Sequence, residues 1–178
     1  MAFYFEYNIF MKIRSFIIEL LKTILTSLAI VFILIHFILM PCVVQGSSMY
    51  PYLQNGDYGF SFIISKNLGI RRFDVAVIDI PDVEDKLLVK RVIGLPNEKI
   101  TFKENKLYVN DEYIEEPFLT GDAYTKDFEV VLGDDEYFCM GDNRSVSRDS
   151  RFYGAFSVKD ILSTKLFVLY PFKDFGMH

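Results

Sequence analysis

Hydrophobic residues follow two different patterns along this chain of 178 residues. Residues 23–56 contain no Lys, Arg, Asp or Glu, and residues 24–44 are apolar except at Thr26, Ser27, His36 and Pro41. A helix that crosses a membrane needs about 20 predominantly apolar residues. The pattern therefore predicts a transmembrane anchor over residues 23–45, preceded by an N-terminal segment of residues 1–22.

Basic residues predict the orientation of this anchor. Lys12, Arg14 and Lys22 precede it, and the next basic residue is Lys66. The positive-inside rule places the basic flank in the cytoplasm. We therefore expect a single-pass protein of the cell membrane, with residues 46–178 outside the cytoplasm. The alternative is a cleaved secretory signal, whose apolar region of about 7–15 residues is shorter than this one.

Short runs rich in Val, Ile, Phe and Tyr follow Gly56, separated by Asn, Asp, Gly and Pro. This alternation is typical of strands joined by turns. Glu104-Asn105 and Asn110-Asp111 favour tight hairpins, and Ser157 is a candidate cap for a short helix over residues 157–161. We therefore expect a mainly β, antiparallel domain over residues 46–178, with strands at 58–64, 74–80, 87–93, 99–103, 106–109, 128–132, 137–140 and 162–169.

Charge and motif content exclude several classes of function. Residues 57–178 carry six more acidic than basic side chains, which argues against nucleic-acid binding. The sequence has no nucleotide-binding glycine motif. Its two histidines, His36 and His178, leave no well-placed base for a Ser-His-Asp site. Cys42 and Cys139 are far apart and belong to no metal motif, so we expect neither a metal nor another cofactor.

The segment after the anchor contains a candidate nucleophile. Ser48 follows Gly46-Ser47 and precedes Pro51. Backbone N–H groups of such a turn can stabilise an oxyanion. Serine and glycine are also common in turns without any catalytic role, so this segment alone does not decide the function.

Two adjacent cations lie in the predicted strand 87–93. Side chains alternate along a strand, so Lys90 shares a face with Leu88 and Val92, while Arg91 lies on the opposite face. Burial lowers the pKa of lysine, and a neutral amine is a competent general base. The alternative is that one cation reaches solvent at a sheet edge and the other pairs with an acid.

A polar loop over residues 141–151 is the third candidate. It contains two acids, three arginines and three serines. Asp142 with Arg144, and Asp149 with Arg151, are candidate hydrogen-bonded pairs that would hold a buried loop. A purely structural polar loop remains the alternative.

These segments together resemble the bacterial type I signal peptidases. The resemblance covers roughly residues 46–171 and lies in Ser48-Met49-x-Pro51, Phe73-Asp74-Val75-Ala76-Val77, Lys90-Arg91-Val92-Ile93-Gly94-Leu95-Pro96 and Gly141-Asp142-Asn143-Arg144-x-x-Ser147-x-Asp149-Ser150-Arg151. It implies a mostly β, membrane-anchored serine endopeptidase that cleaves preproteins after a small-x-small sequence. Its implied partners are preprotein signal peptides, membrane lipid and the secretion translocon.

The resemblance also implies roles for individual residues. Ser48 matches the nucleophile, whose backbone N–H serves the oxyanion, and Lys90 matches the general base. The supporting positions are Ser147, which would orient the lysine, the ion pair of Asp149 and Arg151, and Arg91 and Asp142, which we expect to pair and stabilise the site.

The chain departs from the family pattern at three points. Tyr52 replaces a usual threonine, and Asn97 replaces a usual glycine. The second span and large inserted domain of the longer Gram-negative enzymes are missing, which suits the compact form of Gram-positive bacteria. The alternative function is a catalytically inactive, signal-peptidase-like membrane protein that acts as a binding module. That alternative requires replacement of Ser48 or Lys90, and both are present.

Overall fold

The computed structural model describes residues 2–80, 87–119 and 123–178. It divides the chain into two units, Met1–Ile38 and Leu39–His178. In the first unit, helix α1 (Ala2–Ile33) continues as a π-helical turn over Leu34–Ile38. The segment Phe10–Ile38 is long and apolar enough to cross a membrane, and its large apolar side chains are exposed.

The apolar helix ends earlier than the sequence pattern predicts. Strand β1 begins at Leu39, and its residues pair with β2 from Leu39 opposite Phe62 to Val43 opposite Tyr58. Pro41 lacks an N–H group and its ring clashes within a helix, so a helix is disfavoured here. The last residues of the expected 23–45 span are therefore part of a sheet in the second unit.

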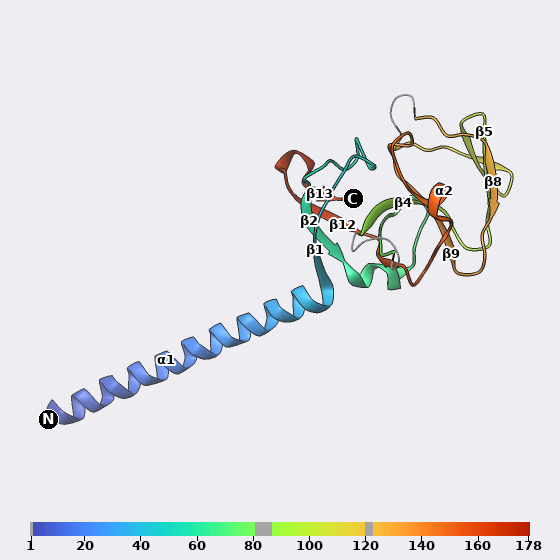
Figure 1. Ribbon diagram of the computed structural model, residues 1–178. Coiled ribbons are helices and arrows are strands. Elements are labelled where there is room, and N and C mark those ends of the chain that lie inside the picture. The colour runs from blue at the N-terminus through green and yellow to red at the C-terminus, as the bar shows by residue number, and fades with distance from the viewer. Residues whose placement is uncertain (1, 81–86, 120–122) are drawn as a thin grey trace. The chain divides into compact units, whose positions relative to one another are not determined.

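The described residues of the second unit form three antiparallel sheets (Figure 1). The first sheet holds the strand that leads to Ser48. Val44, Met49, Leu53, Leu166 and Val168 form a buried cluster with Val75. This sheet has the order β1 (Leu39–Val43), β2 (Tyr58–Phe62), β12 (Leu166–Tyr170) and β13 (Gly176–Met177).

The second sheet holds both cations of the sequence motif on its central strand, β4. Ala76 of β3 lies opposite Lys90, and Val75 opposite Arg91. On the other side, β9 pairs with β4, with Met140 opposite Arg91. The order is β10 (Phe156–Ser157), β9 (Glu136–Met140), β4 (Leu88–Gly94), β3 (Val75–Ile78) and β11 (Ile161–Ser163).

The third sheet confirms the predicted hairpins. Glu104-Asn105 and Asn110-Asp111 form the two-residue turns, and all four residues have positive φ. Asn and Asp tolerate this conformation, and such turns match the twist of paired strands. The order is β7 (Glu112–Ile114), β6 (Lys106–Val109), β5 (Lys99–Lys103) and β8 (Phe128–Val131).

The part of this unit that the structure describes also contains three short helical turns. They are η2 (Ile63–Leu68), α2 (Ser150–Tyr153), which contacts β9, and η3 (Phe172–Asp174) (Figure 1). Asp149 caps α2 by accepting a hydrogen bond from the Arg151 N–H, which satisfies one of the free donors at a helix start.

Two secondary-structure predictions near the C-terminus were wrong. Ser157 ends β10, and its hydroxyl accepts a hydrogen bond from the Lys159 N–H in a turn, not at the start of a helix. The Asp160 carboxylate accepts from the Ser157 N–H and closes this turn. The expected strand over residues 162–169 is divided into β11 and β12, which belong to different sheets.

Candidate active site

Ser48 and Lys90 meet although 42 positions separate them in the sequence. The Lys90 Nζ donates a hydrogen bond of 2.6 Å to the Ser48 Oγ. Ser48 lies in the turn after β1, and this turn is held by the buried side chains of Met49 and Leu53. Lys90 extends from β4. The two groups are therefore positioned by different sheets.

The environment of Lys90 favours its neutral form. The residue is 3% exposed, and burial lowers the pKa of its amine from 10.5 to about 8, although the nearby Asp149 carboxylate opposes this shift. A charged amine loses its hydration on burial, so the neutral form gains population. At mildly alkaline pH the amine can accept a proton from the Ser48 hydroxyl.

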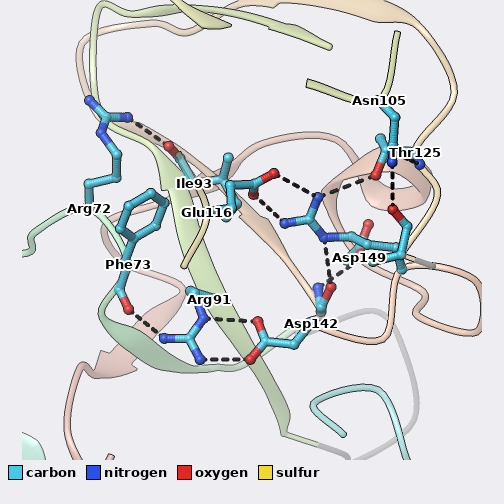
Figure 2. Close-up of polar contacts among 12 residues, drawn as sticks. Arg72, Phe73, Arg91, Ile93, Asn105, Glu116, Thr125, Asp142 and Asp149 are labelled. Atoms are coloured by element: carbon cyan, nitrogen blue, oxygen red, sulfur yellow. Dashed lines mark hydrogen bonds and ion pairs between the residues drawn. The ribbon is translucent and has the colours of Figure 1, made fainter. Parts of the chain in front are cut away.

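Arg91 is buried as fully as Lys90, so neither cation of β4 reaches solvent. Its Nε and Nη2 donate to the Asp142 carboxylate at 2.9 and 2.6 Å, and its Nη1 donates to the Phe73 carbonyl oxygen at 2.9 Å (Figure 2). The expected pair of Arg91 and Asp142 is thus present. Such bidentate geometry fixes the guanidinium plane.

Aromatic rings cover both faces of this guanidinium. The Arg91 Cζ lies 4.3 Å from the ring centroid of Tyr52 and 4.2 Å from that of Phe118. A cation over an aromatic face is attracted by the ring quadrupole. The departure from the family pattern at Tyr52 therefore provides one of the two rings that enclose Arg91.

The expected pair of Asp149 and Arg151 is also present. Arg151 Nε and Nη2 each donate to the Asp149 carboxylate at 2.8 Å, and the Gly141 N–H donates at 3.0 Å. Burial acts to raise the pKa of Asp149, but these hydrogen bonds outweigh it and lower the pKa below its ordinary value. The carboxylate stays charged and ties Gly141 to the start of α2.

Ser147 does not make the contact expected for it. Its Oγ is buried and makes no hydrogen bond of ordinary geometry with the described residues, Lys90 included. The hydroxyl lies against Gly141, where a Cβ would come within 2.3 Å of it. The amine of Lys90 instead donates to Ser48.

Arg144 has a different partner from the one that its spacing indicated. Its guanidinium pairs with the Glu116 carboxylate and not with Asp142, and its Nη1 also donates to the Thr125 hydroxyl at 3.2 Å (Figure 2). The Arg144 Nε donates to the Gly141 carbonyl oxygen at 3.1 Å. Glu116 and Thr125 lie outside the motifs, and no pattern in the sequence indicated that either contacts Arg144.

The Ser48 N–H is available as an oxyanion donor. No described residue accepts a hydrogen bond from it, whereas the Gly46 N–H donates to the Asn55 side chain at 2.9 Å. A free backbone donor beside the serine hydroxyl is what an oxyanion site requires.

Ser48 and Lys90 lie in a cleft of about 560 Å³. The segment through β1 to Met49, the residues around the start of β4 and the loop after β9 supply its lining. A second cavity of about 600 Å³ lies beside Arg144 and Arg151 and contains neither Ser48 nor Lys90.

Within residues 2–80, 87–119 and 123–178, no group of His, Cys, Asp and Glu side chains has the arrangement of a metal site.

A β-sheet fold with a serine in a cleft is compatible with a serine hydrolase. Comparison with known proteins gives the family. The family model described as signal peptidase, peptidase S26, matches residues 17–170. Signal peptidase I S of Bacillus subtilis (strain 168) is 38% identical over 174 residues, which cover 90% of this chain and 93% of that protein.

Signal peptidase IB of Staphylococcus aureus (strain COL) is 33% identical over 178 residues, which cover 89% of this chain and 92% of that protein. A crystal structure of a signal peptidase I from Enterococcus faecalis V583 has 28% identity and a TM-score of 0.49, and it covers 53% of this chain and 95% of that one. On the family model and the curated relatives, the chain belongs to the signal peptidase family.

Family membership confirms the resemblance to type I signal peptidases in their Gram-positive form, and the sheets confirm the mainly β fold. The chain is a serine protease of signal peptide processing.

Proposed function

We propose that Ser48 and Lys90 form a catalytic dyad that removes signal peptides from secreted preproteins. The observation that carries this proposal is the 2.6 Å contact between Lys90 Nζ and Ser48 Oγ, with burial lowering the pKa of that amine to about 8. An efficient general base has a pKa near the operating pH.

The reaction follows from these two groups. The neutral Lys90 amine takes the proton of the Ser48 hydroxyl while the Ser48 Oγ attacks the scissile carbonyl carbon. The Ser48 N–H stabilises the resulting oxyanion. The Lys90 ammonium then gives its proton to the departing amine as the C–N bond breaks, which leaves the signal peptide as an ester on Ser48. A water molecule, activated by the same amine, hydrolyses that ester.

The supporting residues act through the dyad. Arg91 with Asp142, and Asp149 with Arg151, hold β4 and the loop after β9 around Lys90. Ser147 lies in the same loop and has a buried hydroxyl without a hydrogen-bond partner among the described residues. A shift of Ser147 toward Lys90 would let this hydroxyl orient the amine, which is the role that the family pattern implies.

The lining of the cleft suits small side chains before the scissile bond. Val44, Val77, Leu88 and Val89 supply apolar surface beside Ser48. One methylene in such a pocket changes the activation free energy by about 1–3 kcal/mol. We expect cleavage after a small-x-small sequence. In a peptide series with Ala, Val and Phe directly before the scissile bond, equal cleavage of all three would contradict this specificity.

The apolar helix acts as a membrane anchor. Lys12, Arg14 and Lys22 support an orientation with the N-terminus in the cytoplasm and residues from about 39 onward outside. Membrane lipid and the secretion translocon are then the partners that bring preproteins to the cleft. In intact cells, external protease should degrade the domain of residues 39–178, and protection of that domain would contradict the orientation.

Cleavage of a preprotein tests the dyad. The full chain in detergent should cut a preprotein at one site, located by mass, and Ser48→Ala and Lys90→Arg should each lose at least about a hundredfold in rate. Arginine keeps the charge but cannot be deprotonated. Lys103→Arg, an exposed lysine on β5, is the matched control. Near-normal cleavage by Lys90→Arg would overturn the dyad, and binding of the preprotein without cleavage would favour the alternative of an inactive binding module.

A further inference from the structure

The described lining of the cleft that contains Ser48 is basic, whereas the sequence of the domain around it is acidic overall. Residues 57–178 carry six more acidic than basic side chains. The described lining of the cleft nevertheless includes two basic residues, Lys90 and Arg148, and no acidic residue. A cleft lined by charges of one sign attracts ligands of the opposite charge.

Arg148 supplies the permanent part of this charge. It lies in the loop after β9 and is exposed to solvent. Its Cζ lies 4.3 Å from the ring centroid of Phe152 in α2. This cation–π contact limits the positions that the long side chain can take and keeps its charge near the cleft.

No described residue neutralises Arg148. Its neighbour Asp149 points its carboxylate at Arg151 and at the Gly141 N–H. The described residues make no ion pair with Arg148, whereas Arg144 pairs with Glu116 and Arg151 with Asp149. Of the three arginines in this loop, Arg148 alone therefore has its charge available to a ligand within the described part of the chain.

We infer that Arg148 determines specificity by favouring a carboxylate side chain in the preprotein just after the scissile bond. This inference rests on the proposed function. The proposed position of the small side chains before the bond is against the apolar lining residues from β1 and from the start of β4. Arg148 comes from a different element, together with Val146 and Tyr153. The charged contact is therefore assigned to the mature side of the cut.

The size and salt dependence of the effect follow from the exposure of Arg148. Exposed ion pairs shift equilibria by a factor of about two to five. Screening shortens the range of such a pair to about 8 Å at physiological salt and to about 3 Å at 1 M. The preference for a carboxylate should therefore weaken as salt is added, which a preference caused by shape would not do.

Pairs of peptides that differ only by Asp or Asn test this inference. The exchange is made at each of the first two positions after the cut, and kcat/KM is compared for the full chain in detergent. The wild-type protein should favour Asp by about two- to fivefold at one of these positions. Arg148→Gln should abolish the preference, and Arg148→Glu should reverse it. Arg71→Glu, an exposed arginine outside the cleft, changes the net charge equally and should keep the wild-type ratio.

The outcomes separate this inference from the proposed function. Cleavage by the wild-type protein with equal rates for Asp and Asn, or an unchanged ratio in Arg148→Glu, would overturn the role of Arg148 alone. If no peptide is cleaved at all, the proposed function fails and this inference fails with it.

Discussion

The backbone N–H of Asn143 donates a hydrogen bond of 2.9 Å to the carbonyl oxygen of Ser48. Gly141 lies against the same oxygen, so the loop after β9 holds the backbone of the proposed nucleophile at two points. Asp142, between them, pairs with Arg91 on β4. The loop thus connects the turn that carries Ser48 to the strand that carries Lys90.

Gly141 should tolerate no side chain. A Cβ at this position would lie 2.3 Å from the Ser147 Oγ and 2.4 Å from the Ser48 carbonyl oxygen. Because the second atom belongs to the backbone, Gly141→Ala must displace Ser48, and we expect loss of cleavage in the preprotein assay. Gly133→Ala, where the Cβ would lie 3.4 Å from the Glu136 side chain, should stay active. An active Gly141→Ala enzyme would show that the loop does not fix Ser48.

Asp142→Ala should destabilise the protein as well as inactivate it. The side chains of Asp142 and Arg91 are 1% and 5% exposed. Removal of one partner of a buried pair costs about 3–5 kcal/mol, because a charge is left without compensation. Urea denaturation followed by tyrosine fluorescence measures this loss. Lys173→Ala, which removes the exposed partner of the half-buried Asp174, should change stability by less than about 1 kcal/mol. Equal stability of Asp142→Ala and wild type would contradict the structural role.

Glu116→Gln should destabilise the folded protein, although Glu116 lies outside the cleft that contains Ser48. It leaves the buried Arg144 guanidinium without an opposite charge, at a cost of about 3–5 kcal/mol in the free energy of unfolding. The exchanged pair Glu116→Arg with Arg144→Glu should not restore stability, because glutamate cannot donate to the Gly141 carbonyl oxygen as the Arg144 Nε does. A double-mutant cycle measures the interaction between the two positions. If the exchanged pair restores full stability, the hydrogen bond from Arg144 to the Gly141 carbonyl oxygen is not needed.

The buried Lys90 amine should make stability depend on pH. The pKa of Lys90 is about 8 in the folded protein, against an ordinary value of 10.5 for a lysine amine. Below pH 8 the amine is charged in both states, so the folded protein carries the full cost of burial, about 3 kcal/mol. Between pH 8 and 10.5 the unfolded chain binds more protons, so this cost falls as the pH rises.

Replacement of Lys90 by methionine removes that titration. Lys90→Met should therefore be more stable than wild type near pH 7, and the gain should shrink as the pH approaches 10.5. Urea denaturation at several pH values measures the difference, with the exposed Lys159→Met as the matched control. If the gain in stability of Lys90→Met does not change with pH, the pKa of the Lys90 amine is not lowered by burial. Wild-type cleavage should rise with pH through about 8 for the same reason.

The sequence alone determined the features of this protein that depend on neighbouring residues only. Asn and Asp at Asn105, Asn110 and Asp111 determine the hairpin turns through positive φ, and strands β5 and β6 have the boundaries that their alternation predicts. The apolar run before Ile38 is readable because membrane length requires a long uncharged stretch. Ser48, Lys90 and Asp149 are readable as candidates because each lies in a motif of defined spacing.

Only the tertiary structure decided which of these residues meet. Contacts between distant segments depend on the register of the sheets, which local patterns do not specify. The register brings Asp142 to Arg91 and leaves Arg144 for Glu116, although spacing favoured a pair of Asp142 and Arg144. Pairing with β2 also ends the apolar helix before Leu39 and makes that residue the start of a strand. Burial on both faces of β4, which no single strand can encode, lowers the pKa of Lys90 beside Ser48.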